Sequence, residues 1–436
     1  MKVSQILFFG IFFIGISSTE AQERTSFSLE EAIQMAWTKS NEVSLANTKV
    51  NTKKYELQSV KNNQYPDLKI AGQYQRLAKA SIDLKLNKGT NTDALPVVDQ
   101  LMIGQVNANL PIFAGFKIQN SIKVHDNLYQ AETAQSLQTK EDVALKVVHY
   151  YASLYKSQKT IELLKENQKS AQQRVTDFIE LEKNGIIPRN DLLKSQLQLS
   201  KIQLSLDEAN NNLNTVNFYL TTLLKLPAET KLEVRESDFI DFRMDNIPTD
   251  EQPALQNRKD LEAIRFQEKA SLANIKIARS AYYPSIALIG GYTALDLKNV
   301  ITVENAMNFG VGISLLKNGT MVKMAQSKAL EVHNSQEMLT DYIKIQVQKA
   351  IEDYELALKQ STVYGQAVEQ STENYRIVKD KYENGLSDTN DLLEADVEQL
   401  NATINKALAK ANVIQKYYEL LSVTGQLSQS FNFSKI

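Results

Sequence analysis

The chain contains no cysteine, which excludes disulfides, thiolate metal sites, a cysteine nucleophile and a lipid-carrying cysteine. Proline (8 residues) and glycine (15 residues) are scarce in 436 residues, a composition that permits long uninterrupted helices. The formal net charge of −2 argues against a nucleic-acid-binding protein. Beyond the N-terminal segment, no apolar run approaches the roughly 20 residues that a membrane-spanning helix needs.

The N-terminus has the pattern of a secretory signal peptide. A basic start is followed by an apolar run at residues 6–16, and the small residues Thr19 and Ala21 precede the expected cut at Gln22. The run is too short for a permanent helical anchor. We expect residues 1–21 to be removed and the mature protein to be exported without such an anchor.

The sequence repeats itself. Residues 65–74, which begin Tyr-Pro and then alternate, return as residues 283–292. An Asn-Gly turn followed by Asn-Asp-Leu-Leu occupies residues 184–193 and returns at residues 384–393. A repeat of this length predicts two structural copies within one chain.

The repeat predicts the domain organisation. The first copy is expected at residues 22–227 and the second at residues 253–425. Residues 228–252 are a proline-containing linker that we expect to form a small mixed girdle around the equator of the molecule. Residues 426–436 are a polar tail that we expect to be loosely held.

Each copy is predicted to begin with one helix. Ser28 followed by Glu31 forms a capping-box pattern, and apolar residues then recur at helical spacing over residues 29–63. The equivalent helix of the second copy is expected over residues 254–282. In both copies a Tyr-Pro pair ends the helix.

Much longer helices are predicted later in each copy. Residues 117–183 contain neither proline nor glycine, and residues 320–383 contain no proline and one glycine. At about 1.5 Å per residue each helix would be roughly 100 Å long. After each Asn-Gly turn a second helix returns, ending near Leu224 in the first copy and near Thr424 in the second.

Between these helices the apolar period changes from 3.6 to 2, which predicts four strands of about ten residues, the length of a membrane-spanning β-strand. One side of each strand is apolar and the other is small or neutral-polar. The residues expected on the apolar side are Leu68, Ile70, Gly72 and Tyr74; Val106, Ala108, Leu110 and Ile112; Ile286, Leu288, Gly290 and Tyr292; and Met307, Phe309, Val311 and Ile313. The first hairpin is joined by a polar connection at about residues 78–102.

Four strands cannot close a membrane barrel, because the smallest such barrels have about eight strands. An open sheet edge cannot lie in lipid, where unpaired backbone groups cost several kcal/mol each. The pattern therefore predicts chains that associate until the sheet closes around water. The alternative is a soluble periplasmic coiled-coil adaptor or scaffold protein, which would lack paired hairpins of membrane length.

Several motifs resemble one known family. They are Ser28–Ile33 with Asn41 following, the two Tyr-Pro pairs, Leu110–Gly115 at the end of a strand, and Arg258–Leu261, in which Lys259 replaces the family's proline. Over essentially its whole mature length, the chain resembles the TolC-type outer-membrane efflux proteins. No single motif is specific, but two copies in the right order are.

The resemblance implies an α+β membrane protein. Three chains would form a twelve-stranded transmembrane β-barrel on a long antiparallel α-helical barrel in the periplasm of a Gram-negative bacterium. The expected function is a passive outer-membrane exit duct of a tripartite efflux pump or type I secretion system. The expected partners are two identical chains, outer-membrane lipid, a periplasmic adaptor protein, and an inner-membrane pump or ABC exporter.

The two Asn-Gly turns are expected at the periplasmic tips. Locally, Gly185 and Gly385 are explained as glycines in the left-handed conformation that cap a helix C-terminus. The apolar Ile186, Ile187 and Leu386 beside them suggest docking by a partner. By resemblance, these five residues would contact the adaptor.

The resemblance also implies a gate at the tips. Asp391 and Glu394 match acidic gate residues of the family, and Tyr382 matches a tyrosine that bonds an aspartate placed like Asp191. Ser387 stands where the family has its gate arginine, which weakens the expected latch. A simpler explanation of the acids is their favourable place at helix N-termini.

No pattern points to catalysis, and we expect no enzyme, cofactor or metal. His125, His149 and His333 stand alone, without a metal-binding partner one helical turn away. No phosphate-binding loop, serine-nucleophile turn or zinc-ligand spacing is present. The sequence leaves the transported cargo open.

Overall fold

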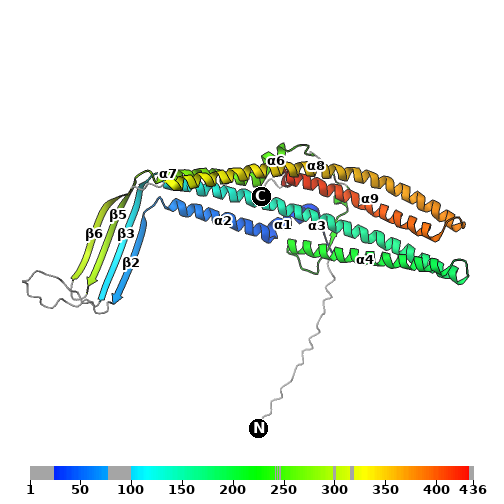
Figure 1. Cartoon of the computed structure of the whole chain (residues 1–436). Helices are drawn as coiled ribbons and strands as arrows, with labels where there is room; N and C mark the ends of the chain where they lie inside the picture. Colours follow the sequence, from blue (N-terminus) through cyan, green and yellow to red (C-terminus); the bar gives the residue numbers. More distant parts are fainter. Residues whose placement is uncertain are drawn as a thin grey trace, which may run out of the picture. The chain divides into compact units, whose positions relative to one another are not determined.

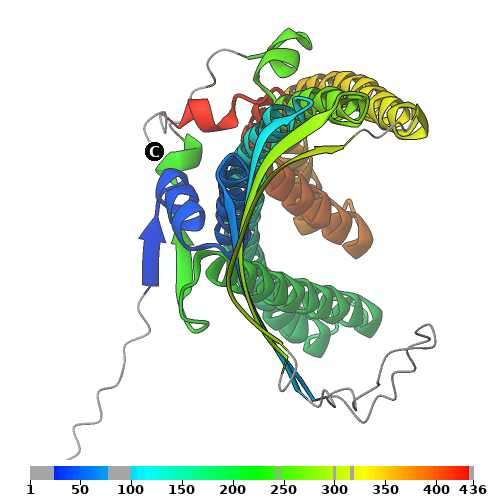
Figure 2. The same ribbon diagram turned by 90° about the vertical axis from the view of Figure 1, so that its left-hand side faces the viewer.

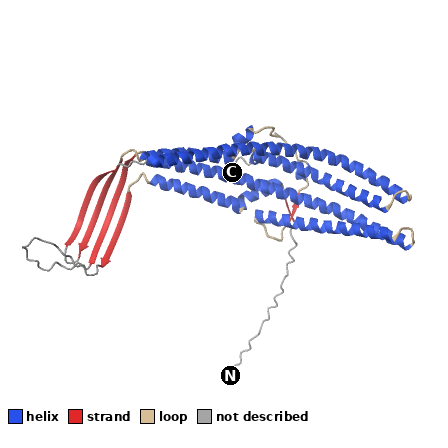
Figure 3. Ribbon diagram, in the orientation of Figure 1, coloured by secondary structure: helices blue, strands red, loops and turns tan. Residues whose placement is uncertain are grey.

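The computed structural model describes residues 24–76, 100–240, 242, 244, 247–297, 301–314 and 319–431. The predicted signal peptide, most of the polar connection in the first hairpin and residues 432–436 of the predicted tail lie outside the described residues. Helices and strands follow each other in the same order twice along the chain (Figures 1 and 3).

Each copy contains two consecutive helices, a β-hairpin and two long helices. The first copy consists of α1 (Leu29–Lys39), α2 (Asn41–Asn62), β2 (Asp67–Arg76), β3 (Gln100–Ala114), α3 (Lys117–Lys183) and α4 (Arg189–Leu224). The second consists of α6 (Gln252–Asn257), α7 (Lys259–Ser280), β5 (Ser285–Leu297), β6 (Ile301–Ser314), α8 (Gly319–Glu383) and α9 (Thr389–Val423). The predicted bounds of the long helices are confirmed to within a few residues.

By their internal contacts, the residues form two compact units. The tip unit takes the chain up to Ser40, Lys146–Met244 and Ala357–Gln415. The sheet unit takes Asn41–Leu145, Asp245–Leu356 and the chain from Lys416 onward.

In the sheet unit, the four membrane-length strands form one antiparallel sheet in the order β2-β3-β5-β6 (Figure 1), and Figure 2 shows that the sheet is curved. The hairpins of the two copies meet at β3 and β5, so the sequence repeat is continuous in one sheet. Two register irregularities, at Pro111/Phe113 and at Thr293/Leu295, interrupt the pairing.

The first helix of each copy is broken by one extended residue, so the prediction of continuous helices was wrong. Ser40 separates α1 from α2 with φ −67° and ψ 142°, and Arg258 separates α6 from α7 with φ −62° and ψ 125°. Apolar residues keep helical spacing across both breaks, and therefore periodicity could not reveal them.

Contacts of the Arg258 side chain anchor this residue at the break between α6 and α7. Its guanidinium is 9% exposed and donates to Asp260, to the Gln346 amide oxygen at 2.8 Å and to the Val423 carbonyl at 3.3 Å. The last contact satisfies a carbonyl at the end of α9, where a cation is favourable. Gly425, just after α9, has φ +69°, and a Cβ there would lie 2.9 Å from the backbone nitrogen of Arg258.

In the tip unit, a short parallel pair joins β1 (Arg24–Phe27) to β4 (Lys231–Val234), next to the one-turn helix α5 (Ser237–Ile240). The predicted mixed segment is thus present, but its partner strand β1 was missed because four residues give too short an alternation. The Tyr151 hydroxyl anchors this region by donating to Asp238 at 2.7 Å. The same carboxylate accepts the Leu29 backbone N–H at the start of α1, and burial raises the pKa of Tyr151.

The described part of the C-terminal tail is packed, which corrects the expectation of a loose end. Leu427, in the short helix α10 (Leu427–Ser430), is fully buried, and Phe431 stacks on Tyr418 with ring centroids 5.2 Å apart. The buried Glu141 carboxylate of α3 accepts the Ser428 backbone N–H at 3.2 Å. The polar composition of the tail concealed these anchors.

The Glu141 contact predicts a pH-dependent stability. Burial raises the pKa of Glu141, and the hydrogen bonds from Ser428 offset only part of that shift. A carboxyl with a raised folded-state pKa contributes most stability below its unfolded pKa, and loses it as pH rises through the folded pKa. We expect Glu141→Gln to remove this dependence and to raise the melting temperature at neutral pH, with the advantage shrinking as the pH falls.

The melting temperature of the detergent-solubilised protein, measured from acidic to neutral pH, tests this expectation. Glu166→Gln removes an exposed carboxylate from the same helix and is the matched control. A Glu141→Gln profile parallel to that of the wild type would contradict the assignment.

Candidate functional site

One face of the four-stranded sheet is apolar across all strands, except in the row near the hairpin connections where Asp296 and Thr302 lie beside Tyr74 and Met102. Residues opposite each other in an antiparallel pair share a face, so the register aligns the predicted apolar positions in rows. Two such rows are Leu68, Ala108, Gly290 and Phe309, and then Ile70, Val106, Tyr292 and Met307. Ile70 and Phe309 are each 85% exposed. The predicted strand phase is confirmed in these rows, but beyond the irregularity at Pro111 the partner of Ile286 is Phe113 and not the predicted Ile112. The sheet presents a large apolar surface.

The opposite face is polar near the helices and more apolar toward the hairpin connections. Asn107 and Asn308 lie in one row there, on either side of Gly291. A Cβ on Gly291 would come within 2.9 Å of the Asn107 amide oxygen, so glycine makes room for the two amides. Further along, a row contains Gln73, Ile103, Leu295 and Val303, which differs from the uniformly small or polar face expected.

A sharp turn joins β3 to α3. Gly115 and Phe116 have φ values of +59° and +65°, a region that non-glycine residues rarely adopt. A Cβ on Gly115 would lie 2.6 Å from the Ser280 carbonyl oxygen, so only glycine fits. Phe116 packs edge-on against Phe113 and Tyr283, with ring centroids 5.4 and 6.1 Å away. The Leu110–Gly115 motif therefore places an aromatic cluster where strands meet helices.

The two Asn-Gly turns of the tip unit have the same geometry. Gly185 has φ +69°, its N–H donates to the Glu182 carbonyl, and the Ile186 N–H donates to the Leu181 carbonyl. Gly385 repeats this pattern with φ +73°. These paired hydrogen bonds form the Schellman motif, which confirms the predicted glycine caps.

The three apolar residues at the tips differ in their surroundings. Ile186 and Leu386 are 67% and 78% exposed. Ile187 instead packs against the buried cluster of Val175, Phe178 and Leu192. The exposed apolar surface of the tips therefore comes from one residue of each turn.

Two of the three predicted gate acids, Asp191 and Asp391, have partners within four residues along the chain. The Asp191 carboxylate lies 3.5 Å from Lys194 Nζ. The Asp391 carboxylate accepts a hydrogen bond from the Ser387 hydroxyl at 2.7 Å. Glu394 is exposed.

Tyr382 lies beside a different partner from the one expected. Its ring stacks on Phe178 of α3 at 6.0 Å, within the same apolar cluster as Leu192. Among the described residues, no hydrogen bond joins the Tyr382 hydroxyl to the Asp191 carboxylate. The tyrosine links the helices of the tip unit through ring packing.

A buried ion pair in the tip unit was not anticipated. Arg174 Nη1 of α3 lies 3.0 Å from Asp396 Oδ2 of α9, with the side chains 11% and 7% exposed. Arg174 falls at helical spacing among the buried residues Ala171, Val175 and Phe178. The signal that could have revealed the pair is a charged residue at a position where helical spacing predicts a buried apolar one.

Exposed apolar stripes run along α4 and α8, mostly at three-, four- and seven-residue spacings. Their members are Leu193, Leu197, Leu204 and Phe218 on α4, and Tyr342, Ile345, Leu356, Val363 and Ile377 on α8. Apolar surface at this spacing is typical of helices that pack against further helices.

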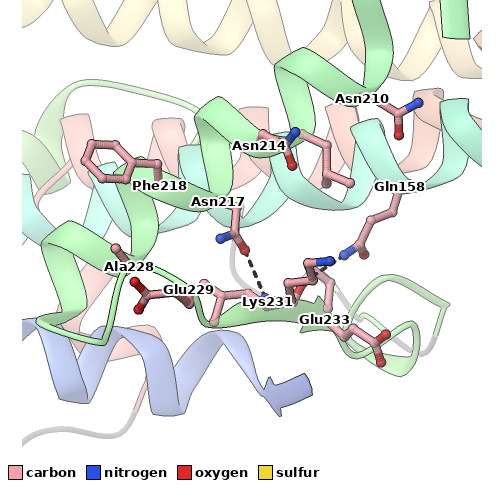
Figure 4. A pocket seen from close by; sticks show the side chains of 12 residues that line it. Gln158, Asn210, Asn214, Asn217, Phe218, Ala228, Glu229, Lys231 and Glu233 are labelled. Carbon is pink, nitrogen blue, oxygen red and sulfur yellow. Dashed lines mark hydrogen bonds between the residues drawn. The ribbon is translucent and has the colours of Figure 1, made fainter. Parts of the chain in front are cut away.

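A cavity of about 700 Å³ lies between α4, α3 and β4 in the tip unit (Figure 4). Two carboxamide side chains that line the cavity form hydrogen bonds with the backbone of β4. Asn217 accepts the Leu232 N–H at 2.9 Å, and Gln158 donates to the Leu232 carbonyl at 3.0 Å. These side chains satisfy one edge of β4 in place of a third strand.

Within the described part of the chain, no group of three or more His, Asp or Glu residues is arranged to hold a metal ion. Two of the histidines contact single polar groups: His125 the Ser121 carbonyl, and His333 the Glu268 carboxylate. None of the helices described is both long enough and apolar enough to cross a membrane.

Comparison with known proteins shows what this chain resembles in sequence and in fold. Residues 252–426 match the family model of outer membrane efflux proteins. No curated protein sequence is significantly similar to the chain.

Several solved outer-membrane channels have the same fold. The CmeC channel of Campylobacter jejuni is 16% identical, with a TM-score of 0.76 over 98% of this chain and 94% of that one. VceC of Vibrio cholerae is 15% identical, with a TM-score of 0.74 over 91% and 96%. MtrE of Neisseria gonorrhoeae is 17% identical, with a TM-score of 0.72 over 92% and 89%.

The second copy carries the family's sequence pattern, and nearly the whole chain has the fold of these channels. The sequence match covers residues 252–426, and the fold of the described chain is that of these outer-membrane channels.

Proposed function

We propose that the protein is the outer-membrane exit duct of a tripartite efflux pump or a type I secretion system. It conducts cargo passively from the periplasmic side to the exterior. The observation that carries the proposal is the four-stranded sheet with one highly exposed apolar face and small and polar residues on much of the other. Such a sheet suits a wall between lipid and water.

The open edges of the sheet support a trimer. In one chain, β2 and β6 each have a neighbour on one side only. Unpaired backbone groups are not tolerated in lipid, so copies of the chain must pair edge to edge until the sheet closes. Three chains supply twelve strands, and the apolar stripes on α4 and α8 supply surfaces along which their helices can pack.

The tips are the proposed docking site for a periplasmic adaptor, which connects the duct to an inner-membrane pump or ABC exporter. Exposed apolar groups on a rigid turn are suited to a protein contact. Gly185 and Gly385 fix the turns, and Ile186 and Leu386 provide the contact. Ile187 supports the turn from within.

The acids of the returning helices are proposed to line the narrow periplasmic end. In a symmetric assembly, Asp191, Asp391 and Glu394 would each form a ring of like charge that attracts cations. Tyr382 would hold the helices at this level through its contact with Phe178. In this proposal the chain has no catalytic role.

The rival proposal is a soluble periplasmic coiled-coil adaptor. An adaptor would also have long paired helices, but it does not need a sheet with an apolar face on which Ile70 and Phe309 are each 85% exposed. We therefore favour the duct. The two-copy division at residues 22–227 and 253–425 belongs to the same proposal.

The sheet face gives a direct test of the duct. Phe309→Asp places a charge on the face proposed to contact lipid, at a cost that is at most about 2–4 kcal/mol near the bilayer centre. We expect the variant to yield much less detergent-extractable oligomer in the outer-membrane fraction than the wild type.

Asn308→Asp is the matched control, because the neighbouring residue lies on the opposite face and should tolerate the charge. Normal assembly of Phe309→Asp together with failure of Asn308→Asp would reverse the assignment of the faces. Recovery of the wild type in the soluble periplasmic fraction would favour the rival.

The tips give a second test. The double variant Ile186→Asp with Leu386→Asp should fold normally, since both side chains are exposed, yet lose binding to the periplasmic adaptor by at least roughly tenfold. Surface plasmon resonance with the purified adaptor measures this loss. Asn190→Asp adds charge at an exposed position near the same tip and should bind as the wild type does, while unchanged binding of the double variant would place docking elsewhere.

A further inference from the structure

The four helix ends that adjoin the sheet are basic. In each of α2, α3, α7 and α8, the five residues nearest the sheet contain no Asp or Glu. They contain five exposed basic residues, which are Lys61, Lys117, Lys276, Arg279 and Lys323. Among the described residues none of these five forms an ion pair, although the whole chain carries a net charge of −2. We call these five residues the basic collar.

The helices themselves explain only part of this charge. α2 and α7 end at the sheet, where a cation is favourable beside the last carbonyl groups. α3 begins at the sheet with Lys117, where a cation is unfavourable, and its first turn contains no acid. By contrast, α4 and α9 carry Asp191 and Asp391 in their first turns. The lysine at the start of α3 therefore suits an anion from outside the chain.

A cavity lies beside this lysine, in the sheet unit. β2 begins at Asp67, opposite Asn109, whereas β3 continues to Ala114. Beside the part of β3 that β2 does not reach, the residues between α2, β2, β3 and α3 enclose a cavity of about 700 Å³. The cavity thus lies where the chain passes from helix to sheet and back.

The cavity offers polar groups to an anion. Lys117 supplies an ammonium group, and Asn62 and Tyr65 supply an amide and a hydroxyl. In the part of the chain that the structure describes, the side chains of these three residues have no hydrogen-bonding partner. The one carboxylate among the lining residues, that of Asp67, lies 3.1 Å from Lys69 Nζ, which balances its charge.

The cavity also adjoins the apolar face of the sheet. Tyr65 lines it, and Phe116 and Tyr283, which pack against each other, are exposed at the same junction. Aromatic residues of membrane barrels gather at the level of the lipid headgroups. Leu68 lines the cavity too, and it leads along β2 to the highly exposed Ile70. Cationic and polar groups therefore adjoin an apolar surface, as the headgroup and acyl chains of a phospholipid require.

We propose that this cavity binds the phosphate group of an anionic phospholipid from the bilayer leaflet next to the helices, with the acyl chains along the apolar face of the sheet. Lys117 provides the charge, and the rest of the basic collar attracts further anionic lipid around the chain. This inference rests on the proposed exit-duct function, because the cavity meets lipid headgroups only if the sheet lies in a bilayer.

Native mass spectrometry of the detergent-extracted oligomer, titrated with phosphatidylglycerol or with zwitterionic phosphatidylethanolamine, tests the site. We expect the wild type to bind phosphatidylglycerol more tightly. Lys117→Gln should weaken that binding by roughly fivefold, the contribution of one lysine near an anionic lipid surface. Lys117→Arg keeps the charge and should bind as the wild type does.

Lys165→Gln is the matched control, because it removes an exposed lysine of α3 in the tip unit, outside the cavity. It should bind phosphatidylglycerol as the wild type does. Equal binding of the two lipids by the wild type, unchanged binding by Lys117→Gln, or an equal loss in Lys165→Gln would each overturn the lipid site and leave the exit duct standing.

Inorganic phosphate separates a lipid site from a site for a free anion. It should displace phosphatidylglycerol no more than sodium chloride does at the same ionic strength, because it lacks acyl chains. Stronger displacement by phosphate would overturn the assignment to lipid. Recovery of the wild type as a water-soluble periplasmic protein without detergent would contradict the exit duct itself, and not only the lipid site.

Discussion

The hydrocarbon core of a lipid bilayer cannot form hydrogen bonds with a peptide backbone, and the rest of the structure depends on this constraint. The β2-β3-β5-β6 sheet presents an apolar face suited to lipid but is too narrow to close on itself. A chain that commits its apolar strand positions to the outside must therefore find its missing strand partners in other copies. Each sequence copy contributes two of the four strands in one chain's sheet. The other strands of a closed barrel come from associated chains.

The helices follow from simpler rules. α3 and α8 contain no proline, and the only glycines in them are Gly319, the first residue of α8, and Gly365. The two helices therefore extend over 67 and 65 residues until an Asn-Gly turn reverses the chain. Glycine is needed at those turns for its positive φ, not for space, since a Cβ at Gly185 or Gly385 would meet nothing within 4 Å. These rigid turns leave Ile186 and Leu386 exposed at the ends of the long helices, where we propose that a partner docks.

Much of the fold could be predicted because it rests on periodicity. The strand phase of Ile70 and Phe309, the long-helix bounds and the two glycine caps all follow from local sequence. What could not be predicted depends on contacts between distant residues. The breaks at Ser40 and Arg258, the packing of Phe431 against the body and the inward position of Ile187 leave no mark on a periodic pattern. Two of the gate residues suggested by resemblance, Asp191 and Asp391, have partners within their own turns, whereas Arg174 and Asp396 lie far apart in the sequence and meet only in the folded chain.

The central claim is that closure of the sheet requires several copies of the chain around a water-filled lumen. Native mass spectrometry of the detergent-extracted protein, released from its micelle, tests this claim most directly. We expect a complex of three chains from detergent solution, and loss of soluble protein when the detergent is removed from the solution. A monomer that remains soluble in water without detergent would contradict it.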